Sequence, residues 1–384
     1  MKIIPFYLPQ FHTFPENDRW WGKGFTEWTN TKKAVPLFEG HYQPHTPYRN
    51  NYYDLMNPET MKSQVKIARE YGIYGFCFYH YWFEDGKLLM EKPVERFLED
   101  KTLDFHFCLS WANEHWTRAW DGGEREIIMR QEYGDRSIWE KHFYYLLPFF
   151  QDERYIYYEN QPLLVIYRPE IIPCFNEMIA CWRELAEKHG LPGLFVVAQG
   201  TVFCMQNHRK KQNKHVDAFM MYEPGYTYAS VKLSNRLEWP LNLLEYRDFA
   251  SQYLLKKIRY KYEELTGKTN TKPVDICDFS LIWNTILKHR IPEDFFPGAF
   301  CGWDNSARRG AKGRIITGST PELFEFFLEK QIKRARDEYH KDIIFFTAWN
   351  EWAEGSHLEP DEKYGFQYLQ AVKNALFSTG EWPY

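Results

Sequence analysis

Eight short runs of apolar and aromatic residues recur along the 384-residue chain, and segments with helical periodicity separate most of them. Strands that are apolar throughout, rather than alternating, belong to parallel sheets that are covered on both faces. Eight such strands alternating with helices predict an α/β fold of the (β/α)8 barrel type. The runs are residues 2–8, 73–79, 105–111, 162–167, 194–198, 218–222, 298–303 and 343–349.

The intervening segments complete this prediction. Helical patterns cover residues 58–71, 94–101, 137–150, 176–189, 321–340 and 365–377. A doubly wound open sheet is the competing fold, but no GxGxxG or P-loop motif follows the first strand. We therefore expect one catalytic barrel domain spanning residues 1–384.

Two connections are much longer than the others. Residues 9–57 follow the first strand, and residues 224–297 form an extended insertion after the sixth, with helices expected at 246–266 and 276–289. Both leave from the carboxyl ends of strands, where barrel enzymes keep their active sites. Long loops at this end are usually functional.

Composition excludes several partners. A net charge of −4 gives no general attraction to nucleic acid or to anionic membranes, and no apolar run is as long as a transmembrane segment. The seven cysteines show no CxxC pair, which indicates free thiols. Met1 is followed directly by a strand pattern, so we expect no secretory signal and a cytoplasmic location. A periplasmic location is the alternative if the native protein has a signal peptide that is removed. Aromatic residues, in contrast, reach 19% of the chain, more than a core needs.

The last strand runs directly into a chemically unusual segment, Trp349-Asn350-Glu351-Trp352-Ala353-Glu354. Two carboxylates three residues apart project into a common space if the loop takes one helical turn. One can then serve as a general acid and the other as a general base. Indole rings beside them can stack on the C–H faces of sugars. The alternative is that Glu351 and Glu354 cap a following helix.

Polar and aromatic residues also follow most other strands, and their repetition predicts a carbohydrate site. For any single member, a packed ring or a structural hydrogen bond is an equal alternative. Glu114 is a reserve catalytic candidate, and we expect Trp111, Trp116 and Trp303 to line one cleft with Glu351. The predicted substrate-binding residues are Glu27, Trp28, His80, Trp82, Trp111, Asn113, Glu114, Trp116, Arg118, Asp121, Tyr222, Trp303, Asp304, Trp349, Asn350 and Trp352. Tyr81, Tyr167, Gln199 and Glu223 also follow strands.

No metal or other cofactor is expected. His41 and His45 are four residues apart, but Pro44 prevents them from sharing a helix face, and there is no HExxH motif. A basic run after the seventh strand contains Arg308, Arg309, Lys312 and Arg314. In barrels this loop often binds phosphate. It predicts an anionic sugar, a diphosphate-linked substrate, or only a solvated loop.

Five segments resemble a known family over nearly the whole chain: FYLPQFH, NDRWWGKGFTEW, FCFYHYWF, WANEHWTRAWDG and WNEWAEG. They look like the WbsX-type proteins, which are encoded among bacterial surface-polysaccharide genes and often labelled glycosyltransferases. More distantly, the E-W-x-E element is similar to glycoside hydrolase family 99, the endo-α-mannosidase group. That resemblance implies a retaining barrel hydrolase without a metal. It implies that Glu351 deprotonates the 2-hydroxyl of the substrate, giving a 1,2-anhydro sugar, and that Glu354 is the acid and then the base.

Three functions fit these features. A retaining hydrolase of α-manno-configured linkages (mannose or rhamnose) in an oligo- or polysaccharide needs an acid, a base and a stacking cleft, all of which the sequence offers. A glycosyltransferase is the second reading, supported by the basic run but not by an Asp-x-Asp element, which the chain lacks. A non-catalytic sugar-binding protein would explain the tryptophans but not the carboxylate pair.

Overall fold

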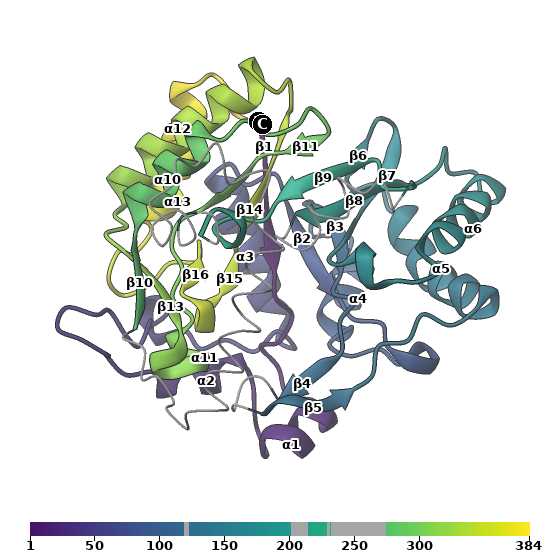
Figure 1. The fold of residues 1–384 in the computed structure, drawn as a ribbon, viewed down its shortest axis with the longest axis horizontal. Helices are drawn as coiled ribbons and strands as arrows, with labels where there is room; N and C mark the ends of the chain where they lie inside the picture. The colour runs from purple at the N-terminus through teal and green to yellow at the C-terminus, as the bar shows by residue number, and fades with distance from the viewer. Residues whose placement is uncertain (119–122, 201–213, 229–230, 232–273) are drawn as a thin grey trace, which may run out of the picture.

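The computed structural model describes residues 1–118, 123–200, 214–228, 231 and 274–384. Its central sheet is a barrel of parallel strands (Figure 1), which confirms the predicted (β/α)8 fold. The strands pair in the order β11-β9-β8-β7-β3-β2-β1-β14-β12. Their bounds are β1 (Lys2–Tyr7), β2 (Gly75–His80), β3 (His106–Trp111), β7 (Gln161–Ile166), β8 (Phe195–Gly200), β9 (Ala218–Met221), β11 (Phe295–Phe296), β12 (Gly298–Phe300) and β14 (Ile343–Thr347).

The seventh strand of the barrel is split at Pro297. Its first part, β11, pairs with β9, and its second part, β12, pairs with β14. The two neighbours approach so closely here that a Cβ atom at Gly298 would lie 1.9 Å from the carbonyl oxygen of Met221. Only glycine fits this position. Because β11 pairs with β9 and β12 pairs with β14, the split strand joins the two ends of the sheet and closes the barrel.

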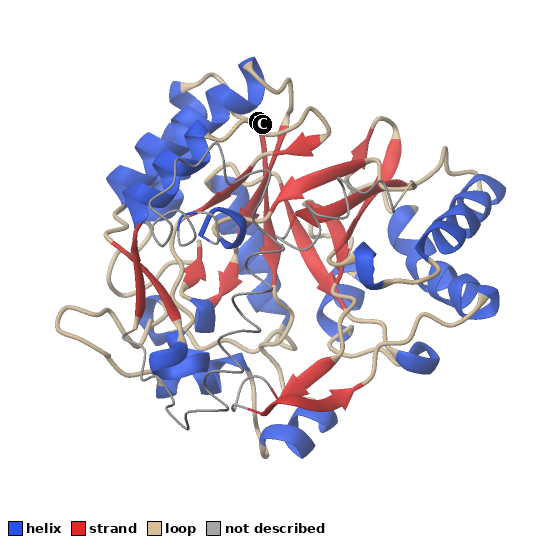
Figure 2. Ribbon diagram, viewed as in Figure 1, coloured by secondary structure: helices blue, strands red, loops and turns tan. Residues whose placement is uncertain are grey.

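Helices cover the outside of the barrel (Figure 2), close to where the periodicity predicts them. They begin at recognisable caps. Asn57 accepts a hydrogen bond from the backbone N–H of Glu59, Asp135 accepts from Ser137, and Thr320 accepts from Leu323. The predicted helices are α3 (Pro58–Glu70), α4 (Lys92–Glu99), α5 (Arg136–Phe150), α6 (Phe175–Lys188), α12 (Pro321–Asp337) and α13 (Gln367–Ser378).

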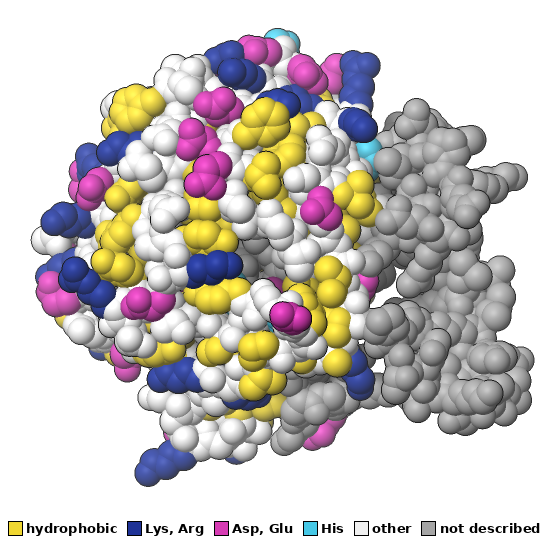
Figure 3. All heavy atoms as spheres, turned by 90° about the vertical axis from the view of Figure 1, so that its left-hand side faces the viewer, with side chains coloured by type: hydrophobic (Ala, Val, Ile, Leu, Met, Phe, Trp, Pro, Cys, Tyr) yellow, Lys and Arg dark blue, Asp and Glu magenta, His cyan; other side chains and the backbone are white. Residues whose placement is uncertain are grey.

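The insertion after the sixth strand is described only in part. The helical pattern at 276–289 forms β10 (Asp275–Asp278) and then α10 (Phe279–Lys288), and β10 pairs with β13 (Arg314–Thr317). The helix predicted at 246–266 lies outside the described residues. No described helix is long and apolar enough to cross a membrane. On the face in Figure 3, acidic and basic side chains are interspersed and apolar ones are scattered.

Side chains on each strand alternate between the barrel interior and the helices. Inside, the ring of Phe6 packs against Tyr79, with 5.3 Å between centroids, and against Phe345. On the outer side, the neighbouring Tyr7 packs against Phe76. Both faces are apolar because both are buried, which explains the continuous apolar runs.

Short elements after the strands build the end of the barrel that carries the candidate site. The long connection after β1, residues 9–57, is called the first excursion and contains α1 (Pro15–Trp21) and α2 (Glu27–Lys33). A hairpin of β4 (Trp116–Arg118) and β5 (Gly123–Met129) follows β3. α11 (Ser306–Arg309) follows β12, while β15 (Asn350–Glu351), the 3-10 turn η5 (Trp352–Glu354) and β16 (Ser356–His357) follow β14. Figure 1 shows α2, α11 and the β4–β5 hairpin at one end of the molecule.

Candidate active site

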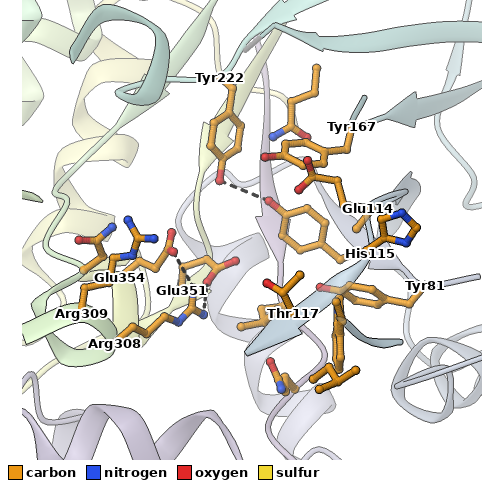
Figure 4. A pocket seen from close by; sticks show the side chains of 18 of the residues that line it. Tyr81, Glu114, His115, Thr117, Tyr167, Tyr222, Arg308, Arg309, Glu351 and Glu354 are labelled. Atoms are coloured by element: carbon orange, nitrogen blue, oxygen red, sulfur yellow. Dashed lines mark hydrogen bonds and ion pairs between the residues drawn. The ribbon is translucent and has the colours of Figure 1, made fainter. Parts of the chain in front are cut away.

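A cavity of about 480 Å³ opens among these loops, and both Glu351 and Glu354 line it (Figure 4). Its walls come from segments after nearly every strand of the barrel, which is why residues so distant in sequence meet here. The lining residues include Gln10, Tyr79, Tyr81, Glu114, Trp116, Tyr167, Gln199, Tyr222, Trp303, Arg308, Arg309, Glu351 and Glu354.

The local backbone explains how the two glutamates share this cavity. After β14 the chain makes the single 3-10 turn η5, so Glu351 precedes the turn and Glu354 ends it. Gly355 then takes a left-handed conformation with φ of 56°, where a Cβ atom would lie 2.9 Å from the Cβ of Asp304. Glycine relieves both constraints and lets the chain leave the turn at once. The single helical turn that lets Glu351 and Glu354 project into a common space is therefore present.

The guanidinium of Arg308 joins three carboxylates. It donates from Nε to Oε1 of Glu27 at 2.9 Å, from Nη1 to Oε1 of Glu354 at 2.6 Å, and from Nη2 to Oε2 of Glu351 at 3.1 Å. The Arg308 side chain is only 10% exposed, and Glu27 is fully buried. Arg308 therefore fixes two cavity carboxylates relative to each other, with Glu27 behind them as its anchor.

Charge and burial act together on this cluster. Three ionised carboxylates around one guanidinium would leave two negative charges uncompensated in a largely buried cluster. Burial raises the pKa of Glu351 above its ordinary value, and Glu354 and Glu27 add to the rise while Arg308 opposes it. Burial also raises the pKa of Glu27 against the pull of Arg308. The cluster can thus hold a proton at a pH where an exposed glutamate has lost its own.

Four more of the predicted substrate-binding residues line the cavity: Glu114, Trp116, Tyr222 and Trp303. The carboxylate of Glu114 forms an ion pair with Arg168. The hydroxyl of Tyr222 lies 3.3 Å from that of Tyr79. All four side chains are only partly buried, so they keep surface that a ligand can contact.

A second group of predicted residues lies on the helix-facing side of the sheet. His80 and Trp111 are paired neighbours on β2 and β3, and both turn away from the cavity. The Nε2 atoms of His80 and His142 are 2.8 Å apart, and Trp82 stacks on His142 with 4.3 Å between centroids. Burial lowers the pKa of His80 to about 3, so the imidazole is a neutral core group. Of the three tryptophans expected in one cleft, Trp116 and Trp303 line it and Trp111 does not.

Three predicted aromatic residues support the site from behind. Trp28 donates its indole N–H to the carbonyl of Tyr53 at 2.8 Å and packs against Trp352. Trp352 donates to Glu359 at 2.7 Å, and Trp349 is fully buried. None of the three lines the cavity.

The remaining predicted polar residues bind protein groups or cannot be placed. Asn350 bonds the backbone N–H and carbonyl of Leu8, and Asn113 does the same with Arg168. The carboxylate of Asp304 accepts from His41 at 2.6 Å and from Gln43 at 2.7 Å. Arg118 ends β4, opposite Gly123. Asp121 lies outside the described residues.

Several cavity residues are absent from the predicted set. Tyr81, Tyr167 and Gln199 follow strands, as the predicted residues do, and Tyr79 lies inside a strand run without any distinguishing signal. Two buried amides are notable, because within the described chain Nε2 of Gln10 and Oε1 of Gln199 have no hydrogen-bond partner. A buried amide atom without a partner is costly to the folded state.

Comparison with known proteins agrees with this architecture. Two solved structures share the fold over almost the whole chain. The GH99 endo-alpha-mannosidase from Bacteroides thetaiotaomicron is 12% identical with a TM-score of 0.56, covering 98% of this chain and 97% of that one. A glycoside hydrolase-like protein is 11% identical with a TM-score of 0.55, covering 97% and 93%. At such identities the likeness establishes the fold alone.

The sequence comparisons are closer. The uncharacterized protein WxcX of Xanthomonas campestris pv. campestris is 34% identical over 381 residues, covering 97% of this chain but 49% of WxcX. The chain thus spans about half the length of the curated relatives it matches. The model of the family described as Glycosyltransferase WbsX matches residues 3–372. The chain belongs to the WbsX family.

Proposed function

We propose that this protein is a retaining glycoside hydrolase that cleaves α-manno-configured linkages, of mannose or rhamnose, in a polysaccharide. One observation carries the proposal: Glu351 and Glu354 are held by one guanidinium at the wall of a cavity that is rich in aromatic side chains. General acid–base chemistry at a glycosidic bond needs two such carboxyl groups. The glycoside-hydrolase-like barrel and the E-W-x-E element support the same assignment.

In the first step, Glu351 takes the proton of the sugar 2-hydroxyl. The O2 atom attacks the anomeric carbon as the bond to the leaving oxygen breaks, and Glu354 gives its proton to that oxygen. In the second step, Glu354 takes a proton from water, which opens the 1,2-anhydro ring, and Glu351 returns its proton to O2. Two inversions at the anomeric carbon give overall retention.

The electrostatics of the cluster suit Glu351 as a base once it is ionised. A carboxylate with a raised pKa is a stronger base once it is ionised, and a sugar hydroxyl is a weak acid that needs one. Arg308 supplies a fixed positive charge beside both glutamates, which limits the repulsion when Glu354 loses its proton. Arg308 is therefore proposed as the residue that positions the pair.

The cavity walls suit a saccharide. Trp116, Trp303 and the tyrosines offer apolar ring surfaces together with polar edges. The side chains of Gln10 and Gln199 add amide groups to the cavity wall. A pocket with many rings and few convergent polar groups is typical of small-molecule sites.

The α-manno configuration follows from the proposed mechanism. An internal 2-hydroxyl can displace a leaving group only from the opposite face of the ring. The two groups must be trans and able to align along one axis, which α-mannosides and α-L-rhamnosides allow. Incubation with panels of both glycosides, with release of reducing ends as the readout, tests the proposal directly. Failure of every α-manno linkage, with cleavage of another configuration, would exclude it.

The pH profile of kcat/KM should have an acidic limb above the ordinary glutamate pKa of about 4.3. Glu351 acts as a base only when ionised, and burial raises its pKa, so activity is lost as the pH falls through that raised value. Glu27→Gln removes a negative charge that adds to the rise and should move the limb to lower pH. The exposed Glu362→Gln is the control. If the acidic limb of the pH profile were at the same pH in Glu27→Gln as in the native protein, Glu27 would not raise the pKa of the catalytic base.

Sugar binding should quench tryptophan fluorescence through the cavity indoles. Trp303→Ala removes a ring from the cavity wall and should weaken binding by about tenfold or more, the effect of losing a well-buried apolar contact. Trp111→Phe is the matched control, because Trp111 lies outside the cavity. Titration with an unhydrolysed saccharide checks both. Equal loss in the two variants would show that Trp303 acts through the fold.

Glycosyl transfer is the second candidate function. Arg309 lines the cavity next to Arg308, where cations could contact a donor phosphate, and the family is described as a glycosyltransferase family. Within the cluster, however, Arg308 already binds three carboxylates. Incubation with nucleotide-activated mannose and rhamnose separates the two functions. Transfer from these donors without cleavage of α-manno glycosides would favour the transferase.

A further inference from the structure

A second cavity, of about 150 Å³, lies beside the candidate active site and shares Trp303 with it. His45, His357 and Asp361 line this cavity. One ligand atom from each residue lies within 4.8 Å of the corresponding atoms of the other two. His357 and Asp361 are buried, and His45 is partly buried. The cluster joins the first excursion to the segment that follows the two glutamates.

The hydrogen bonds of His357 orient a nitrogen toward this cluster. Its Nδ1 atom lies 3.0 Å from the carbonyl oxygen of Glu359, so Nδ1 carries the proton and the lone pair of Nε2 is directed away from it. That Nε2 lies 2.9 Å from Nδ1 of His45.

The carboxylate completes the donor set. Oδ1 of Asp361 accepts from the backbone N–H of Tyr364 at 2.6 Å, and Oδ2 lies 3.4 Å from the hydroxyl of Tyr42. Lys363 lies over the Tyr42 ring, with its Nζ atom 4.6 Å from the centroid. Two imidazoles and one carboxylate are a typical ligand set for zinc and for other first-row divalent metals.

We propose that His45, His357 and Asp361 bind one divalent ion of the zinc class, with water completing the coordination. Without the ion, the same atoms form one imidazole–imidazole hydrogen bond. With it, the ring proton of His45 moves from Nδ1 to Nε2, so that Nδ1 presents its lone pair, and both nitrogens and a carboxylate oxygen move to ligand distance. The ion is not part of the hydrolytic steps, and its role is structural.

The position of the cluster indicates what the ion would stabilise. The ring of His357 stacks on Trp352 with centroids 3.7 Å apart and an angle of 14°. Trp352 is the first residue of η5, between Glu351 and Glu354. Asp361 also forms a backbone bridge to Pro47, near His45. An ion here would therefore connect the first excursion to the turn that holds the glutamates.

The test measures metal binding, so its result does not depend on whether the protein is a hydrolase. The whole protein is freed of metal with a chelator and titrated with Zn²⁺ and with Co²⁺. We expect one tight equivalent of Zn²⁺, visible d–d absorption from Co²⁺, and a higher Tm with Zn²⁺ than without it. Less than one equivalent bound, with no change in Tm, would overturn the proposal.

Variants locate the ion. His45→Gln and the conservative Asp361→Asn should each weaken Zn²⁺ binding at least tenfold and remove the rise in Tm. His106→Gln, a half-buried histidine at the start of β3, should leave both unchanged. Circular dichroism establishes that each variant is folded. Tight binding that persists in both folded variants would refute the site, as would equal loss in His106→Gln.

Discussion

Glu351→Gln and Glu354→Gln are each expected to lower turnover on an α-manno substrate by at least ~10²-fold, the low end for loss of general acid–base catalysis. Glutamine keeps the shape of each side chain but can neither take nor give the proton. Steady-state kinetics on the best glycoside from the panel provide the measurement. Near-native activity in either variant would make the role assignment wrong.

Leaving groups separate the two roles. A good leaving group does not need the acid, so activated substrates should restore much more activity to Glu354→Gln than to Glu351→Gln. Glu362→Gln, an exposed neighbour in sequence, serves as the control and should keep full activity. Thermal unfolding of all three variants shows whether the losses arise from chemistry or from the fold.

A 2-deoxy substrate is expected to be inert. It lacks the hydroxyl that Glu351 deprotonates, so no 1,2-anhydro sugar can form. An enzyme that uses a carboxylate nucleophile would still cleave it, although a retaining carboxyl pair at ~5 Å suits both routes. Turnover of the 2-deoxy glycoside is compared with that of its parent under the same conditions.

Product stereochemistry gives an independent check of the same mechanism. NMR of the first product formed should show the α-anomer, because two inversions restore the configuration. Inversion, or brisk cleavage of the 2-deoxy analogue, would refute participation of the 2-hydroxyl. The barrel and its cavity would remain as described.

The strands of the barrel could be predicted because their signal is local. A run such as 343–349 is apolar on both faces, and β14 (Ile343–Thr347) is found within it. The turn after it could also be anticipated, since Glu351 and Glu354 have a common direction only if the chain curls once. The hairpin after β3 is harder to predict. Its strands β4 and β5 pair irregularly, with register shifts on both sides of Thr117.

The side chains facing the cavity could be predicted only in part. Being near the end of a strand does not determine which face of the sheet a residue takes, and alternation places Tyr79 in the cavity but His80 and Trp111 behind it. A shift of one residue exchanges the two faces, and an all-apolar strand carries no pattern that fixes the choice. Sequence spacing alone does not reveal this.

The basic run shows a second limit. Of the three readings offered for it, none was an ion pair with the predicted catalytic residues, yet Arg308 binds Glu351, Glu354 and Glu27. These partners are 43, 46 and 281 residues away in the chain. The local pattern of a single sequence does not couple positions so distant.

The pairing of β1 with β14 has a consequence for how the protein is made. Lys2 lies beside Ile343, so β1 waits for β14, which is synthesised much later, before its second edge is covered. Until then a nascent chain exposes unpaired strand edges, which are prone to aggregation. The chain segment that covers this edge also carries both glutamates into place. We therefore expect translation stalled before residue 343 to yield chains that depend on chaperones and have no activity.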